Sequence, residues 1–216
     1  MLNLLLFDQI PIEEQLSIEE DLLRNDDKNW CILNTGSKKT IILGLSSKKE
    51  EMLNIKKVDR DNIPVIKRFS GGGTVIVDSN TLFATFIFQK KSHCFPPYPK
   101  SIANWTKEFY QKALQIPHFD LKENDYTIKN HKVGGNAQYI RKNRWLHHSS
   151  FLYDFEDTNM DYLLNPITQP SYRNQRNHLD FLTRLKPHIS KKNFIKKIQA
   201  ELNKRYQITS PKKIIL

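Results

Sequence analysis

The stretch Arg68-Phe-Ser-Gly-Gly-Gly-Thr-Val-Ile-Val-Asp78 places three consecutive glycines between two strand-like segments, Pro64 to Phe69 and Thr74 to Val77. A glycine inside regular structure is destabilising by roughly 0.5–1 kcal/mol relative to alanine, so a triplet is tolerated where another body must approach the backbone closely. Consecutive glycine N–H groups can form an anion-binding nest, and Lys67 and Arg68 supply positive charge for a phosphate or carboxylate. On the triplet alone, a plain glycine-rich hairpin turn is an equally good interpretation. The stretch matches neither a P-loop nor a dinucleotide-binding G-x-G-x-x-G.

A second stretch, His131-Lys-Val-Gly-Gly-Asn-Ala-Gln138, again sets a cation beside a glycine pair. A lysine is seldom buried in an apolar strand unless an anionic group pairs with it. Taken alone, Lys132 is better explained as a solvated lysine at the end of a strand. Two cationic, glycine-rich turns in one small chain nevertheless favour a shared site for a phosphate-containing ligand.

The third stretch, Arg144 to Asp154, contains His147 and His148, followed by Ser149 and Ser150. Neighbouring side chains on a strand point to opposite faces, so at most one histidine can face a given pocket. The pair therefore cannot converge on one metal ion, and we predict no metal site. A serine nucleophile is not supported either, because no nucleophile-elbow pattern surrounds these serines.

Apolar runs of strand length alternate with segments of helical spacing along the rest of the chain. The runs Trp30 to Leu33 and Thr40 to Leu45 flank Thr-Gly-Ser-Lys-Lys, which predicts a hairpin. Further strands are expected at 1–7, 82–88, 126–128, 132–133, 136–140 and 145–153, and helices at 11–24, 48–55, 101–114, 160–164, 177–185 and 193–206. Strands interrupted by single helices indicate an α+β fold: a single domain, residues 1–216, with a mainly antiparallel mixed β-sheet flanked by helices.

Composition excludes several classes of protein. The chain has 216 residues, 38% hydrophobic and 11% aromatic, which is enough for a core and speaks against general disorder. No apolar run reaches the roughly 18 residues that a membrane span needs. The net charge of +11 suits acidic partners, but the lysines are spread through the chain without a nucleic-acid-binding signature, so we expect neither nucleic acid nor a membrane as partner. Two cysteines, Cys31 and Cys94, form neither a disulfide framework nor a four-thiolate zinc site, which favours the cytosol or an organelle matrix.

In order and spacing, the three stretches resemble the motifs of the lipoate-protein ligase A family, within the biotin and lipoate ligase superfamily. The family pattern R-R-x-S-G-G-G-[AT]-V-x-x-D stands here as Lys67 to Asp78. A second pattern, N-D followed downstream by K-[VIF]-x-G-x-A-[QY], matches Asn124-Asp125 and Lys132 to Gln138. A third, H-H-G-[ST]-[LI]-L, matches His147 to Leu152. The resemblance covers roughly residues 10 to 185 and implies the α+β fold of that superfamily.

The resemblance also implies a reaction. Its members attach lipoate or octanoate to the acceptor lysine of lipoyl domains, through an acyl-adenylate made from ATP with Mg²⁺. Lys132 is implied as the catalytic lysine at the acyl carbonyl and phosphate, where an ammonium and glycine N–H groups stabilise developing negative charge. The positions that carry over to binding of the acyl chain and adenylate are Arg68, Ser70, Gly71, Gly72, Gly73, Thr74, Asn124, Gly135, Ala137, His147 and His148. The two histidines would border the acyl pocket.

The same resemblance implies partners and a location. The partners would be acidic lipoyl-domain proteins, namely E2 subunits of 2-oxoacid dehydrogenases and the H protein of glycine cleavage. The location would be the cytoplasm or an organelle matrix. An acidic acceptor would give the basic surface of this chain a purpose.

Three departures from the family pattern bear on the reaction. Ser149 replaces the glycine after the histidines, which predicts a tighter or differently bent corner. Where one octanoyltransferase branch has its nucleophilic cysteine, upstream of the lysine motif, this chain has Lys122-Glu-Asn124, which disfavours a thioester-forming transferase. The chain ends at Leu216, without room for the accessory domain of many bacterial ligases, so we expect the catalytic domain alone.

Two rival functions stay open: ATP-independent transfer of octanoyl or lipoyl groups between proteins, and binding of acylated proteins by a catalytically silent member. The intact Arg68, glycine triplet and Lys132 argue against lost chemistry. The segment Asn165 to Arg176 is a candidate cover for a reactive adenylate, with Arg173 and Arg176 to reach a phosphate, although a solvated surface loop is the competing interpretation. We expect this chain to use lipoyl-adenylate but to activate free lipoate slowly, or with an accessory protein.

Overall fold

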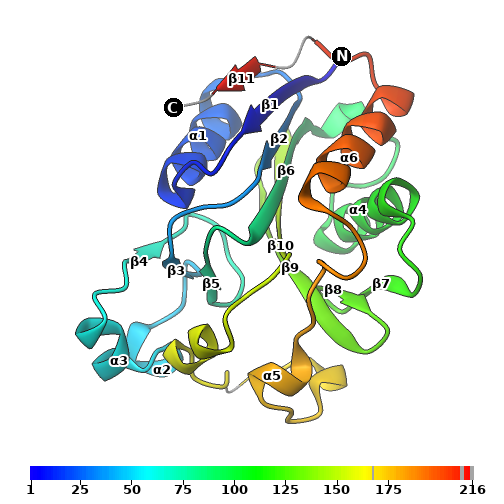
Figure 1. Cartoon of the computed structure of the whole chain (residues 1–216). Coiled ribbons are helices and arrows are strands. Elements are labelled where there is room, and N and C mark those ends of the chain that lie inside the picture. Colours follow the sequence, from blue (N-terminus) through cyan, green and yellow to red (C-terminus); the bar gives the residue numbers. More distant parts are fainter. Residues whose placement is uncertain (167, 210–211, 215–216) are drawn as a thin grey trace.

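The computed structural model describes residues 1–166, 168–209 and 212–214. Its centre is an eight-stranded mixed sheet (Figure 1). Across the sheet the strands are β11 (Lys212–Ile214), β1 (Asn3–Phe7), β2 (Trp30–Asn34), β6 (Thr81–Gln89), β10 (Arg144–Leu152), β9 (His131–Ile140), β8 (Asp125–Ile128) and β7 (Phe119–Lys122). β1 pairs in parallel with β11 and β2, and the other neighbours are antiparallel. The expected α+β fold with a mainly antiparallel mixed sheet is confirmed.

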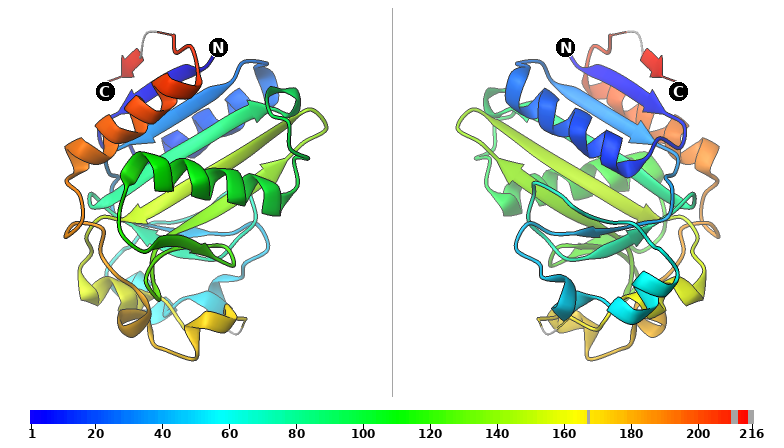
Figure 2. Two further views of the ribbon diagram at one scale, coloured as in Figure 1. Left: turned by 90° about the vertical axis from the view of Figure 1, so that its right-hand side faces the viewer. Right: turned by 90° about the vertical axis from the view of Figure 1, so that its left-hand side faces the viewer.

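Helices cover both faces of the large sheet. α4 (Pro99–Leu114) and α6 (Lys191–Arg205) lie on one face, and α1 (Ile12–Asn25) lies on the other (Figure 2). Strand β6 runs through the middle and is buried at every position from Thr81 to Phe88, because both of its faces are covered. The largest core cluster fills the α4 and α6 side and includes Phe86, Phe109, Trp145, Phe151 and Phe194.

A second, three-stranded sheet carries the glycine triplet. Its strands are β4 (Val65–Lys67), β3 (Thr40–Leu43) and β5 (Val75–Val77), and β3 lies in the middle, parallel to β4 and antiparallel to β5. The triplet therefore belongs to a crossover from one edge of this sheet to the other, and the plain hairpin turn is excluded. The crossover passes so close to the end of β3 that a Cβ built on Gly44 would lie 1.9 Å from the carbonyl oxygen of Gly72.

The predicted hairpin of Trp30 to Leu33 with Thr40 to Leu45 is wrong. The first run is β2, between β1 and β6 of the large sheet, and the second is β3 of the small sheet. The glycine between them serves close packing, because a Cβ on Gly36 would lie 2.7 Å from the carbonyl oxygen of Ser79. A turn-like composition here marks contact with a distant segment, which local patterning does not reveal.

Short elements join the two sheets and surround the lower end of the molecule in Figure 1. They are α2 (Lys49–Met52), α3 (Ile55–Arg60), α5 (His178–Phe181) and the 3₁₀ turns η2 (Asp157–Tyr162) and η3 (Ser171–Arg173). A further 3₁₀ turn, η1 (Lys90–Ser92), follows β6 at the upper end of the molecule in Figure 1. The long helices expected at 11–24, 101–114 and 193–206 are confirmed. The helices expected at 48–55 and 177–185 are shorter in the structure, where α2 and α5 have four residues each, and the one expected at 160–164 overlaps the 3₁₀ turn η2. In the three described ranges, no helix is long and apolar enough to cross a membrane.

Candidate active site

The glycine triplet is held open by the side chain of Arg68. Its guanidinium donates to the carbonyl oxygen of Gly71 at 3.0 and 3.2 Å and to that of Gly73 at 2.8 Å. Gly72 between them has a φ of +109°, a conformation that side chains rarely adopt. Arg68 is buried, and this burial lowers the pKa of its guanidinium to about 10. Arg68 therefore shapes the loop through its backbone carbonyls, which leaves the loop N–H groups for a ligand.

Lys132 lies beside the loop because strand β9 contains an irregularity. Asp125 pairs with Gly135, but the register between β8 and β9 then shifts by one residue, so that Thr127 pairs with Lys132. Residues 132 and 135 would point to opposite faces of a regular strand. The bulge brings them to the same face, and the Lys132 Nζ lies only 3.4 Å from where a Cβ on Gly135 would be. Gly135 thus lies beside the lysine side chain, whereas Gly134 serves close packing, because a Cβ there would lie 2.8 Å from the carbonyl oxygen of Ser150.

The anionic partner that a sheltered lysine requires is Asp125. The Lys132 Nζ lies 2.7 Å from the Asp125 Oδ1, and the two side chains are 23% and 13% exposed. The other carboxylate oxygen accepts a hydrogen bond of 2.9 Å from the Tyr172 hydroxyl. This carboxylate orients the ammonium next to the glycine loop and ties the segment around Tyr172 to the same point.

Two cavities meet at Lys132. We name them the α1 cavity, of about 370 Å³, and the α5 cavity, of about 420 Å³, after the helices that border them. Both are lined by Gly73, Thr74, Val75, Asn124, Asp125, Lys132, Gly135 and Ser150. Arg68, Gly71, Gly72, Ala137 and His148 line the α1 cavity alone. A molecule with two unlike halves could therefore place its junction at the lysine and the glycine loop.

The far wall of the α1 cavity is apolar and ends at a buried polar cluster. Leu16, Ile42 and Phe83 line the cavity together with His148. Behind it, the Glu19 carboxylate is fully buried and lies 2.9 Å from the His148 Nδ1. The same carboxylate accepts hydrogen bonds from Thr85 and, at 2.7 Å, from Gln15. The His148 ring is thus fixed from α1, a feature that no sequence motif indicated.

His147 lies on the opposite face of β10, as strand alternation requires, and lines neither cavity. Its Nε2 is 2.8 Å from the Tyr126 hydroxyl within the core, and burial lowers the pKa of its ring to about 3. Of the two histidines expected to border the acyl pocket, His148 therefore lines a cavity and His147 does not. The bend expected at Ser149 is not observed either, because β10 pairs continuously with β6 and β9 through this residue.

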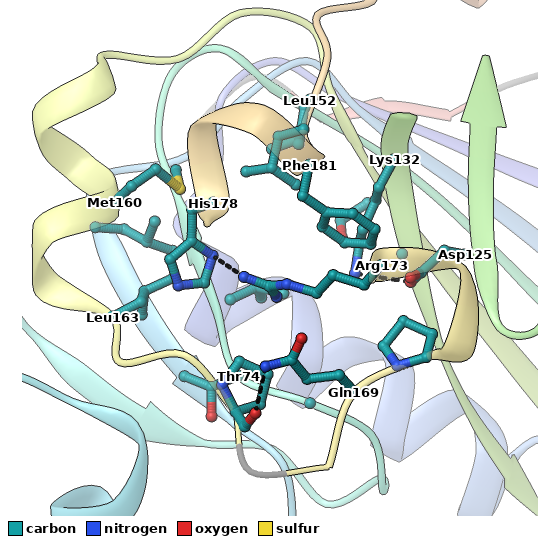
Figure 3. Close-up of a pocket in the computed structure, with 18 of the residues that line it drawn as sticks. Thr74, Asp125, Lys132, Leu152, Met160, Leu163, Gln169, Arg173, His178 and Phe181 are labelled. Atoms are coloured by element: carbon teal, nitrogen blue, oxygen red, sulfur yellow. Dashed lines mark hydrogen bonds and ion pairs between the residues drawn. The ribbon is translucent and has the colours of Figure 1, made fainter. Parts of the chain in front are cut away.

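The α5 cavity is covered by the segment from Asn165 to Phe181, of which Ile167 lies outside the described residues (Figure 3). Ser171 anchors the segment through two hydrogen bonds to the Glu123 carboxylate, of 2.6 and 2.7 Å. Arg173 is 4% exposed, lines the cavity and stacks over Phe181. The segment is therefore a packed wall of the site, which supports its interpretation as a cover over that of a solvated loop.

The remaining predicted residues are placed as follows. Ser70 is buried, and its carbonyl oxygen accepts a hydrogen bond from the Leu45 N–H. Ser70 lines neither cavity. Cys31 is buried in the core, whereas Cys94 is exposed and away from both cavities. In the described part of the chain, no group of three or more His, Cys, Asp or Glu could hold a metal ion.

The chain matches one family model, described as the lipoyl protein ligase A/B catalytic domain, over residues 11–207. It is 34% identical over 202 residues to the inactive lipoate-protein ligase 2 of Plasmodium falciparum, with 75% of this chain and 51% of that protein covered. The chain spans about half the length of the curated relatives it matches.

Two solved structures share the fold. A lipoate-protein ligase A bound with ATP gives a TM-score of 0.80 at 16% identity, with 99% of this chain and 88% of that chain covered. A bipartite lipoate protein ligase of Thermoplasma acidophilum, described with its E2 lipoyl domain, gives 0.79 at 18% identity, covering 99% and 86%. At these identities the likeness shows the fold alone, whereas the family model spans most of the sequence. The chain belongs to the lipoyl protein ligase A/B catalytic domain family.

Proposed function

We propose that this chain attaches lipoate or octanoate to the acceptor lysine of a lipoyl domain, with an acyl-adenylate as the donor. One observation carries this proposal: two differently lined cavities meet at Lys132 and the glycine loop. The α1 cavity, with Leu16 and Phe83, suits an acyl chain. The α5 cavity, which also has Gln169, Arg173 and His178 in its wall, suits a nucleotide.

The phosphate of such an adenylate would lie between the two cavities. There the N–H groups of the glycine loop and the Lys132 ammonium can both stabilise negative charge. Asp125 pairs with the ammonium and keeps it directed at this point. Mg²⁺ would accompany ATP in the activation step, supplying charge neutralisation on the phosphates.

The transfer step needs no further reagent. The acceptor amine attacks the acyl carbonyl carbon, a C–N bond forms, and the C–O bond to phosphate breaks. AMP leaves with that electron pair, and the amine releases one proton to solvent. Negative charge builds on the carbonyl oxygen and on the departing phosphate, which is where the loop and Lys132 lie. The site therefore matches the charge that develops in this reaction.

The rival transferase would need a thiol near the acyl carbonyl. Cys31 is fully buried, and burial raises the pKa of its thiol. Cys94 is exposed but lines neither cavity. Both facts favour the adenylate route. The other rival function is that of a catalytically silent binding protein. It is favoured by the similarity to the Plasmodium relative, which is described as inactive.

Mass spectrometry of a lipoyl domain separates these functions. One arm supplies preformed lipoyl-adenylate, a second ATP, Mg²⁺ and lipoate, and a third an octanoylated carrier protein without nucleotide. We expect rapid addition of one lipoyl group from the adenylate and slower addition in the second arm. Equal rates in the first two arms would show that activation needs no accessory protein. Modification only from the octanoylated carrier, or from no donor, would overturn the proposal.

A further inference from the structure

Tyr172 belongs to the segment that covers the α5 cavity, yet its hydroxyl contacts the carboxylate that pairs with Lys132. The hydroxyl lies 2.9 Å from the Asp125 Oδ2. The Oδ1 of the same carboxylate lies 2.7 Å from the Lys132 Nζ, the ion pair drawn in Figure 3. Burial, together with the charge of Asp125 and the hydrogen bond itself, raises the pKa of the Tyr172 hydroxyl. The hydroxyl therefore keeps its proton and is the donor in this contact.

Other contacts hold Tyr172 in place without its hydroxyl. The neighbouring Ser171 donates from its backbone N–H and from its side chain to the Glu123 carboxylate, at 2.7 and 2.6 Å. The Tyr172 ring packs against Phe181 with a centroid distance of 5.2 Å, and the Lys122 Nζ lies 5.9 Å from the centroid of the tyrosine ring. A phenylalanine at position 172 would keep all of these contacts. The hydroxyl is therefore not needed to dock the segment.

Tyr172 does not reach the space that a donor molecule would occupy. It lines neither cavity, whereas Asp125 and Lys132 line both. An effect of its hydroxyl on the reaction must therefore pass through Asp125. A hydrogen bond to one carboxylate oxygen fixes the rotation of the carboxylate, which sets where the other oxygen holds the Lys132 ammonium. Without this bond, both oxygens could hold the ammonium, and it would lose its single position beside the glycine loop.

We propose that Tyr172 is a positioning residue, which holds the Lys132 ammonium in place by fixing the Asp125 carboxylate. This inference rests on the proposed function, in which Lys132 stabilises the negative charge that develops at the acyl carbonyl and the phosphate. Because Tyr172 contacts the partner of the lysine and not the donor, its hydroxyl should affect the chemical step and not the binding of lipoyl-adenylate. The cover of the α5 cavity thus contributes to the reacting site as well as enclosing it.

Single-turnover transfer from preformed lipoyl-adenylate to a lipoyl domain tests this inference. Tyr172→Phe should lower the rate at saturating donor roughly ten-fold, because a small displacement of a catalytic group slows the chemical step. The donor concentration that gives half of this rate should stay within about two-fold, since an interaction that matters only in the transition state does not change binding. An unchanged rate in folded Tyr172→Phe protein would overturn the inference.

Tyr162→Phe is the matched control. The Tyr162 hydroxyl also donates to an aspartate Oδ2, that of Asp61, and the distance is again 2.9 Å. Neither residue of this pair lines a cavity, so the control should keep both the rate and the half-saturating donor concentration. A ten-fold loss in Tyr162→Phe as well would attribute the effect to loss of any buried tyrosine hydroxyl, against the inference.

A double-mutant cycle distinguishes positioning from a structural role. The Lys132→Ala protein has no ammonium to position, so Tyr172→Phe should slow transfer no further in that background. A ten-fold loss that persists there would contradict the inference. Ser171→Ala removes one hydrogen bond that docks the cover but keeps the contact between Tyr172 and Asp125, so it should retain the rate at saturating donor. A loss equal to that of Tyr172→Phe would assign the effect to docking instead.

A measurement without turnover keeps this result separate from the proposed function. In NMR spectra that correlate the lysine Cε hydrogens with Nζ, the signal of Lys132 is identified by its loss in Lys132→Ala. Tyr172→Phe should shift this Nζ signal, whereas Tyr162→Phe should not. If no donor transfers its lipoyl group, the proposed function fails, but a shift confined to Tyr172→Phe would still support the positioning of Lys132. An unshifted Lys132 signal in Tyr172→Phe would refute it.

Discussion

At the scale of single residues, the site depends on a lysine that is charged yet sheltered. The Lys132 ammonium lies 2.7 Å from Asp125, and the Tyr172 hydroxyl holds the other carboxylate oxygen. An incoming phosphate would join a lysine that is already oriented, so little reorganisation is needed when the transition state forms. The pair is partly exposed, so its contribution to the stability of the fold is small.

Replacement of Lys132 by alanine should therefore reduce activity far more than stability. Loss of one preorganised donor costs about 2.7–4 kcal/mol in the transition state, so lipoyl transfer from lipoyl-adenylate should slow by a factor of ~10² or more. The measurement is kcat/KM with a lipoyl domain, together with a thermal unfolding curve. Lys142→Ala, which removes an exposed lysine from the turn after β9, is the control and should leave both unchanged. Near-normal transfer by folded Lys132→Ala protein would exclude Lys132 from the mechanism.

At the scale of elements, the three glycines of the crossover between β4 and β5 are not equivalent. A Cβ on Gly72 would lie 2.7 Å from the Arg68 Nη2, and its φ of +109° already requires glycine. A Cβ on Gly71 or on Gly73 would meet no atom within 4 Å. Gly72 therefore has a role in the fold, whereas the open space over Gly71 and Gly73 is the space that a ligand would occupy.

This difference separates a ligand-binding loop from a structural one. Gly73→Ala should raise the KM for lipoyl-adenylate about ten-fold, or about 1.4 kcal/mol, because the methyl group enters the space shared by both cavities. Its melting temperature should change by no more than about 2–4 °C, the shift that 1 kcal/mol gives in a chain of this size. Gly72→Val should lower the melting temperature by more than Gly73→Ala does. A Gly73→Ala protein with unchanged KM would show that the donor does not pass against this loop.

At the scale of the whole molecule, the excess of positive charge acts over a distance. The chain carries 34 Lys and Arg against 23 Asp and Glu, for a net charge of +11. Such a charge accelerates encounters with an acidic macromolecule, by a factor of roughly 10–10³ in steered associations, and salt screens the effect.

An acidic lipoyl domain should therefore be a poorer substrate at high salt. On raising the ionic strength from about 0.1 to about 1 M, we expect kcat/KM for the domain to fall roughly ten-fold or more. Measured at saturating lipoyl domain, the KM for lipoyl-adenylate should change much less, because the donor is bound by local contacts in the cavities. A lipoyl domain with its acidic residues changed to amides should lose the salt dependence. A dependence that persists with that domain would contradict electrostatic steering.

Much of this architecture can be predicted from the amino-acid sequence. Apolar runs located six strands of the large sheet, though not the edge strands β7 and β11, and amphipathic spacing located α1, α4 and α6, because element type follows from local periodicity. The sequence also identified the glycine-rich stretches and Lys132, and it indicated that a buried lysine would need an anionic partner. These features follow from the chemistry of the residues themselves.

Local sequence patterns do not predict which strands pair with each other, or in which register. Neither the separation of β2 and β3 into two sheets nor the one-residue shift in β9 has a local signature, because strand pairing depends on long-range packing. That shift alone brings Lys132 to the face of Gly135 and Asp125. Glu19, Gln169 and His178 likewise became part of the site only when distant segments were packed together, since a hydrogen-bond partner or a cavity is a property of the folded chain.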